Sequence, residues 1–147
     1  MLPATFRFVA INRTGQSQTT AGGAAMSVEY KLWKFDSGAV SWSAEDTDDL
    51  THEATSVDNA VLEGSTVDNS TNLYMGLRGR FEVTTDHTSS DGVWQLYLDT
   101  STDGGTDWAS DNISDPDTDE EAGIAMQMIG QTQTIDGAMT VAFDFEL

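Results

Sequence analysis

The most regular feature of the chain is a period-two alternation of apolar and polar residues, which is typical of strands with one buried face. Convincing stretches with the 3.6-residue period of an amphipathic helix are missing. The longest alternating stretch, residues 73–83, predicts a half-buried strand in which Gly76 and Gly79 mark bulges or crossing points. Its predicted inward-facing residues are Leu73, Met75, Leu77, Gly79, Phe81 and Val83.

The same alternation predicts further strands elsewhere. Residues 138–147 and 93–99 alternate clearly, and the second stretch places Trp94 on an apolar face. The tripeptide Asp36-Ser37-Gly38 predicts a tight turn between two weaker strands. Residues 46–63 are the only segment that allows a short helix. The weaker strand patterns cover residues 4–11, 27–35, 39–44 and 123–131.

Together these patterns predict an all-β fold. Seven to nine strands, joined by loops rich in Gly, Asp, Ser and Thr, are typical of an antiparallel β-sandwich or jelly roll. The length of 147 residues fits one domain, residues 1–147, with enough surface to bury a core without a metal or disulfide. Residues 12–26, rich in Gly, Gln, Ser and Thr, are predicted to form a flexible or docking arm.

The net charge of the chain limits the classes of molecule that it is expected to bind. Six Lys and Arg residues stand against 25 Asp and Glu residues, so the formal net charge is −19. Binding to bare nucleic acid or to an anionic membrane needs clustered cations, and we therefore expect neither. The acidity fits a solvated surface suited to high salt, where self-repulsion is screened, or a surface that binds divalent cations. The chain has no cysteine, which leaves its redox compartment open.

The most specific local pattern is the octapeptide Ser-Thr-Asp-Gly-Gly-Thr-Asp-Trp at residues 101–108. Ser and Asp side chains hydrogen-bond nearby amides, glycines supply positive φ, and a tryptophan can cover such a turn. The segment resembles the Asp-box hairpin of sialidases and other β proteins, except that Asp107 stands where the motif usually has Thr. The resemblance implies a structural turn without catalytic function. The matching residues are Ser101, Asp103, Gly105 and Trp108.

Carboxylates in two stretches raise the question of calcium. Asp99, Ser101, Asp103 and Gly104 follow the opening of an EF-hand loop, but Ser110 stands where that loop has its bidentate Glu. Acidic side chains also alternate in a second stretch, residues 115–121. The candidate calcium ligands come from these two stretches. The alternative is a set of solvated loops in an acidic chain, with no cofactor at all. The candidate ligands are Asp99, Asp103, Asp115, Asp117 and Asp119.

The sequence does not favour an enzyme. His52 and His87 are its only histidines, and neither lies near a nucleophile-elbow sequence. Phosphate-binding and dinucleotide-binding fingerprints do not occur. Trp33 lies out of phase with the apolar positions of its strand, which makes it the candidate aromatic for an exposed interface. We therefore expect a binding or assembling protein without catalytic residues.

In general character the chain resembles small β-sandwich structural proteins of tailed-virus particles, namely decoration (cement) proteins and tail proteins. The resemblance rests on a compact, cysteine-free, strand-rich chain without a signal-peptide pattern and on the hairpin segment 92–105. It implies a capsid decoration protein, made in the host cytoplasm and located in the virion, that forms trimers or hexamers and contacts the major capsid protein. The alternatives are a tail-tube or head–tail connector protein and a carbohydrate- or calcium-binding attachment module.

Overall fold

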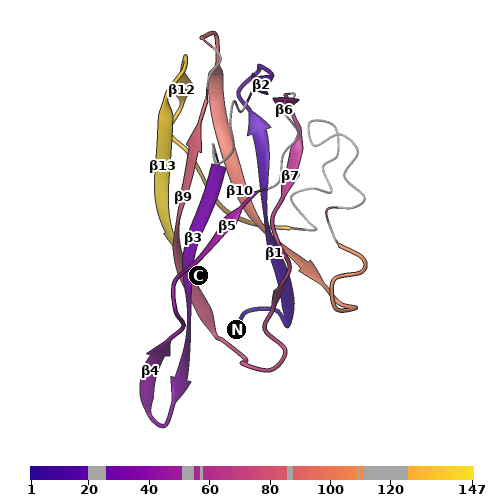
Figure 1. Ribbon diagram of the computed structural model, residues 1–147, viewed down its shortest axis with the longest axis vertical. Helices are drawn as coiled ribbons and strands as arrows, with labels where there is room; N and C mark the ends of the chain where they lie inside the picture. The colour runs from indigo at the N-terminus through magenta and orange to yellow at the C-terminus, as the bar shows by residue number, and fades with distance from the viewer. Residues whose placement is uncertain (20–25, 51–54, 57, 86–87, 109, 111–125) are drawn as a thin grey trace.

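The computed structural model describes residues 1–147 except 20–25, 51–54, 57, 86–87, 109 and 111–125. The described residues form antiparallel strands and no α-helix. A six-stranded and a five-stranded sheet pack face to face, and a two-stranded ribbon lies beside them (Figure 1). This architecture confirms the predicted all-β sandwich.

The six-stranded sheet is centred on β1 (Thr5–Arg13), which pairs along its full length with β10 (Asp91–Ser101). On its other side β1 pairs with two short strands, and β10 carries two more. These short strands are β7 (Val61–Glu63), β8 (Val67–Asp68), β11 (Gln127–Gln131) and β12 (Ile135–Asp136).

The five-stranded sheet has the order β13-β9-β3-β4, with β5 paired to the first half of β3. The second half of β3 pairs with β4, and this β3–β4 hairpin projects beyond the rest of the sandwich (Figure 1). The strands are β3 (Met26–Asp36), β4 (Ala39–Trp42), β5 (Asp46–Asp49), β9 (Gly76–Thr84) and β13 (Thr140–Glu146).

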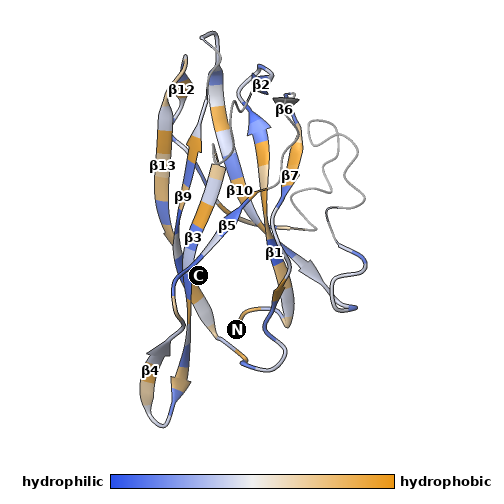
Figure 2. Ribbon diagram, in the orientation of Figure 1, coloured by the Kyte–Doolittle hydropathy of each residue, from blue (hydrophilic) through white to orange (hydrophobic). Residues whose placement is uncertain are grey.

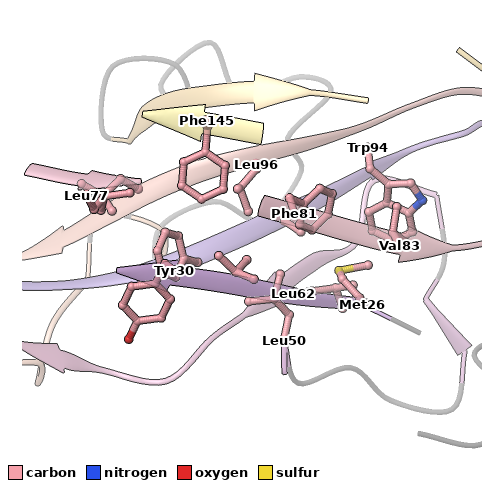
Figure 3. Close-up of a cluster of buried hydrophobic side chains, with 14 of the residues drawn as sticks. Met26, Tyr30, Leu50, Leu62, Leu77, Phe81, Val83, Trp94, Leu96 and Phe145 are labelled. Carbon is pink, nitrogen blue, oxygen red and sulfur yellow. The ribbon is translucent and has the colours of Figure 1, made fainter. Parts of the chain in front are cut away.

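The core lies between the two sheets and follows the alternation of the sequence (Figure 2). β10 contributes Trp94, Leu96 and Leu98, as predicted, and β1 contributes Phe6 and Phe8. Side chains from β3, β9 and β13 meet them from the facing sheet (Figure 3). These include Met26, Tyr30, Phe81, Val83 and Phe145.

The predicted turn between the weaker strands joins β3 to β4. Ser37 and Gly38 have φ angles of 53° and 86°, which match the two central positions of a type I′ hairpin turn. Only a residue that tolerates the left-handed region fits there, and the Asp-Ser-Gly sequence supplies such residues. The prediction of this turn is confirmed.

The strand predicted over residues 73–83 begins later, at Gly76. The buried side chain of Asn69 accepts a hydrogen bond from the amide of Tyr74 and donates one to its carbonyl. It so holds the residues between Asn69 and Tyr74 in a turn before β9. Leu73 consequently has a φ of 53° and, with Met75, is exposed instead of buried. The prediction that these two residues face the core was wrong, because a polar turn overrides the apolar pattern.

The glycines of this strand do not mark bulges. β9 pairs without a register break with β3 and with β13. A Cβ atom at Gly79 would lie 2.6 Å from the carbonyl oxygen of Glu29 and 2.7 Å from the ring of Phe145. Glycine is needed there because the adjacent strand β3 and an aromatic ring approach the backbone closely.

The described part of residues 46–63 forms no helix. It forms β5, the short strand β6 (Thr55–Ser56) and β7, so the short helix allowed by the sequence is not found there. β6 pairs with β2 (Gln18–Thr19). β5 pairs with β3, and the buried Asp48 carboxylate accepts the amide of Ser65. Strand pairing therefore satisfies backbone groups that a helix would have paired internally.

Of residues 12–26, predicted as an arm, the structure describes residues 12–19 and Met26, which begins β3. Asn12, Thr14 and Gln18 are buried. The side-chain amide of Gln18 donates through Nε2 to Thr14 Oγ1 (2.8 Å) and to Ser90 Oγ (2.7 Å) beside β10. Residues 20–25 lie outside the described part.

Leu96 and Leu73 offer a matched test of this fold. Leu96 is fully buried in the core, whereas Leu73 is 56% exposed. We expect Leu96→Ala to lower the free energy of unfolding by about 2–5 kcal/mol, because it removes buried contacts and leaves a cavity. Leu73→Ala is expected to change it by less than about 0.5 kcal/mol. Urea unfolding of both variants measures this, and equal losses would contradict the placement of the two residues.

Candidate functional site

The turn that follows β10 is built by the side chains of Ser101 and Asp103. Ser101 Oγ accepts the amide of Gly105 (2.8 Å) and donates to Asp103 Oδ1 (2.7 Å). The same Asp103 oxygen accepts the amides of Thr106 (3.1 Å) and Asp107 (3.0 Å). These hydrogen bonds, the Asp107 amide first and then the Ser101 hydroxyl, lower the pKa of Asp103. The turn is therefore most stable with an ionised carboxylate.

Trp108 closes this turn, as the Asp-box pattern suggests. Gly104 and Gly105 have φ angles of 81° and 97°, which lead the chain back towards the sheet. The Trp108 indole donates to the Gly105 carbonyl (3.1 Å), and its ring is buried. The four residues predicted as a turn motif thus lie in one turn, in which the side chains of Ser101, Asp103 and Trp108 and the backbone of Gly105 form its hydrogen bonds.

Arg7 forms a charge network beside this turn, in which Arg7 and Asp99 are buried and Glu63 is partly exposed. Its guanidinium donates to both carboxylate oxygens of Glu63 (2.9 and 2.8 Å), to Asp99 (3.1 Å) and to Ser110 Oγ (2.7 Å). Ser110 Oγ in turn donates to Asp99. The guanidinium also lies over the Trp108 ring, 4.3 Å from its centroid. These contacts tie β1, β7, β10 and the turn together on the outer face of the six-stranded sheet.

The predicted calcium ligands are placed differently from one another. The Asp99 carboxylate is fully buried against the Arg7 guanidinium, whose positive charge opposes a cation there. Asp103 holds the turn described above. Asp115, Asp117 and Asp119 lie outside the described residues, as do His52 and His87. Among the residues that the structure describes, no group of three or more acidic or histidine side chains could hold a metal ion.

Trp33, the predicted interface aromatic, lies near the base of the β3–β4 hairpin. Its side chain is partly exposed on the outer face of the sheet, where it is paired in register with Trp42. The Trp33 ring meets the Phe35 ring edge-on at 6.2 Å. Phe35, Val40 and Trp42 are 60%, 49% and 47% exposed, so the hairpin presents a cluster of apolar side chains. We call Trp33, Phe35, Val40 and Trp42 the apolar hairpin.

A groove of about 550 Å³ lies on the outer face of the five-stranded sheet, next to Trp42. We call it the charged groove, because cations and carboxylates line it side by side. Lys31 pairs with Glu45 (3.3 Å), and Arg80 pairs with Asp144 (3.4 Å) and Glu82 (3.6 Å). Its principal lining residues are Lys31, Trp42, Glu45, Arg78, Arg80 and Asp144.

Tyr30 separates the charged groove from the core. Burial, followed by the nearby carboxylates of Asp46 and Asp48, raises the pKa of the Tyr30 phenol well above 10. The phenol therefore stays protonated and donates to Asp46 Oδ2 (3.3 Å). This bond holds β3 against β5 and makes Tyr30 unsuited to act as a base.

The residues that matter most in these arrangements were not singled out by sequence reasoning. Arg7 stands in the apolar run Phe-Arg-Phe-Val-Ala-Ile, and a lone cation in such a run is a signal of a buried, paired charge. Lys31 and Arg78 carry no local signal, because their proximity arises only from the pairing of β3 with β9.

Comparisons with protein-family models, with curated proteins and with solved structures find no match to this chain. No helix among the described residues is long and apolar enough to cross a membrane.

The pKa of Asp103 predicts how acid weakens the turn. A carboxyl whose pKa falls on folding contributes stability above its ordinary pKa of 3.8, and this contribution is lost as the pH falls through the lower folded-state pKa. We expect Asp103→Ala to lower the melting temperature at about pH 7, and this difference to shrink at about pH 2.5.

Asp107→Ala is the matched control, because Asp107 lies in the same turn and contributes its backbone amide to Asp103. Thermal melts should show little effect of this variant at either pH. A loss of melting temperature in Asp103→Ala that did not vary with pH would contradict the role of the ionised carboxylate.

Proposed function

We propose that this chain is a non-catalytic structural protein of a virus particle, a capsid decoration protein that assembles through the apolar hairpin. The observation that carries the proposal is the exposure of Phe35, Val40 and Trp42 on a hairpin that projects from the sandwich (Figure 1). Contiguous exposed apolar side chains on an otherwise polar surface are typical of protein–protein interfaces. Such contacts repeated around a particle give strong attachment by multivalency.

The apolar character of this region is concentrated. Seven large apolar side chains are exposed in the described part of the chain, and three of them belong to the apolar hairpin. Two more, Leu73 and Met75, follow the turn beside it, where the Met75 amide donates to the Trp33 carbonyl (2.8 Å). The exposed apolar side chains of this acidic protein are therefore concentrated at one end of the five-stranded sheet.

The edge of the sheet at this end is open to pairing. Within the described sheet, β4 pairs only with β3, and its four residues, Ala-Val-Ser-Trp, are exposed and uncharged. The opposite edge strand, β13, carries Asp144 and Glu146 at exposed positions. Charged residues protect an edge strand from pairing with another chain, so β13 is protected and β4 is not.

The partner that fits this edge best is a neighbouring copy of the chain. Each copy carries a formal charge of −19, which opposes association at low salt. The hairpin contains only Lys34 and Asp36 as charged residues, and its projection separates the contact from the acidic body. Association through it should therefore strengthen when salt screens the remaining repulsion. Trimers or hexamers that contact the major capsid protein remain the proposed arrangement in the virion.

The proposal predicts that Val40→Asp weakens self-association at least about tenfold, because it places a charge in the apolar contact. Met128→Asp is the matched control: Met128 is 44% exposed on β11, in the other sheet, and should leave association unchanged. Light scattering across protein and salt concentration measures the mass of each protein. A wild-type chain that is monomeric under all conditions, or equal effects of the two variants, would contradict the proposal.

A further inference from the structure

The charged groove holds an unusual share of the positive charge. The chain has six Lys and Arg residues, and three of them, Lys31, Arg78 and Arg80, line this one groove. All three lie on two adjacent strands, β3 and β9. In a protein of net charge −19, these three cations balance the three carboxylates that line the same groove, Glu29, Glu45 and Asp144.

Two of these cations are placed directly opposite each other. Lys31 and Arg78 are register partners across β3 and β9, a placement that disfavours the sheet because like charges repel. Glu45 offsets the charge of Lys31 at 3.3 Å. Arg78 forms no ion pair with any carboxylate in the described ranges, although Glu146 is its register partner on β13. Arg78 is exposed, and its guanidinium is free to donate to an anion.

The remaining lining of the groove restricts the kind of anion. Glu29, Glu45 and Asp144 also line it, and together with the net charge they repel a polyanion such as a nucleic acid or a highly acidic peptide. The same carboxylates accept hydrogen bonds from hydroxyl groups. Trp42, at the end of the groove, offers an aromatic ring that is 47% exposed. The groove thus combines one free cation, several acceptors and an aromatic face.

We propose that the charged groove binds an acidic saccharide, that is, an otherwise neutral sugar chain that carries a single carboxylate group, as one uronic acid does. The sugar carboxylate binds Arg78 and relieves its repulsion with Lys31. The hydroxyl groups donate to Glu45 and Asp144, and the apolar face of a sugar ring packs on Trp42. The volume of about 550 Å³ is within the range of small-ligand sites. For a particle protein, such a site would attach the particle to an acidic glycan surface.

The test is the binding of the full chain to a panel of oligosaccharides that each carry a single uronic acid, each compared with its neutral counterpart, by calorimetry. We expect at least one acidic member to bind and its neutral counterpart to bind at least about tenfold more weakly. Arg78→Gln should weaken binding of the acidic saccharide by a similar factor. Lys34→Gln is the matched control, because it removes one charge from β3 outside the groove and should leave binding unchanged.

Three results with the saccharides would overturn the inference. These are no binding of any acidic member, equal binding of acidic and neutral saccharides, and equal affinities of wild type and Arg78→Gln. Stronger binding of polyglutamate than of the saccharides would also overturn it, in favour of an acidic peptide ligand. Arg78 lies outside the apolar hairpin, so the mass of Arg78→Gln in solution should equal that of the wild type. Because Trp42 belongs to both surfaces, saccharide binding is measured at concentrations where light scattering shows the chain to be monomeric, and the two proposals then succeed or fail separately.

Discussion

The ion pairs of the buried Arg7 guanidinium with Glu63 and Asp99 are the interaction on which the outer face of the six-stranded sheet depends. β1 is buried on both faces over most of its length: Phe6, Phe8 and Ala10 face the main core, while Arg7 shares the outer face with a smaller apolar cluster. A charge in that position is tolerated only because Glu63 and Asp99 neutralise it and Trp108 covers it. Loss of the Arg7 guanidinium would leave the fully buried Asp99 carboxylate without its ion-pair partner.

This arrangement gives the two sheets different roles. The outer face of the six-stranded sheet is closed by the Arg7 network, the Asp-box-like turn and the cluster of Val9, Ile11, Tyr97 and Met126. The outer face of the five-stranded sheet is open, and it carries both the apolar hairpin and the charged groove. The first sheet therefore buries much of its outer face, and the second carries the surfaces proposed for assembly and for saccharide binding.

How much the sequence predicts depends on the range of the interactions involved. The long strands and the Asp36–Gly38 turn are visible because alternation and turn chemistry are local signals. β5, with the sequence Asp-Thr-Asp-Asp, lies in the segment for which the sequence allows a short helix, and it forms a strand because β3 lies beside it. With such short strands, the described residues form more strands than the seven to nine predicted. The partners of Arg7 and the pairing of Lys31 with Arg78 arise from contacts far apart in the sequence, which no local pattern reveals.

Hydrogen exchange of the β4 amides as a function of protein concentration tests the assembly claim most directly. If neighbouring copies pack on the apolar hairpin, exchange at residues 39–42 should slow as the concentration rises, while exchange at residues 127–131 of the other sheet should stay constant. Exchange at residues 39–42 that is independent of concentration, or protection that appears first on β11, would contradict the account.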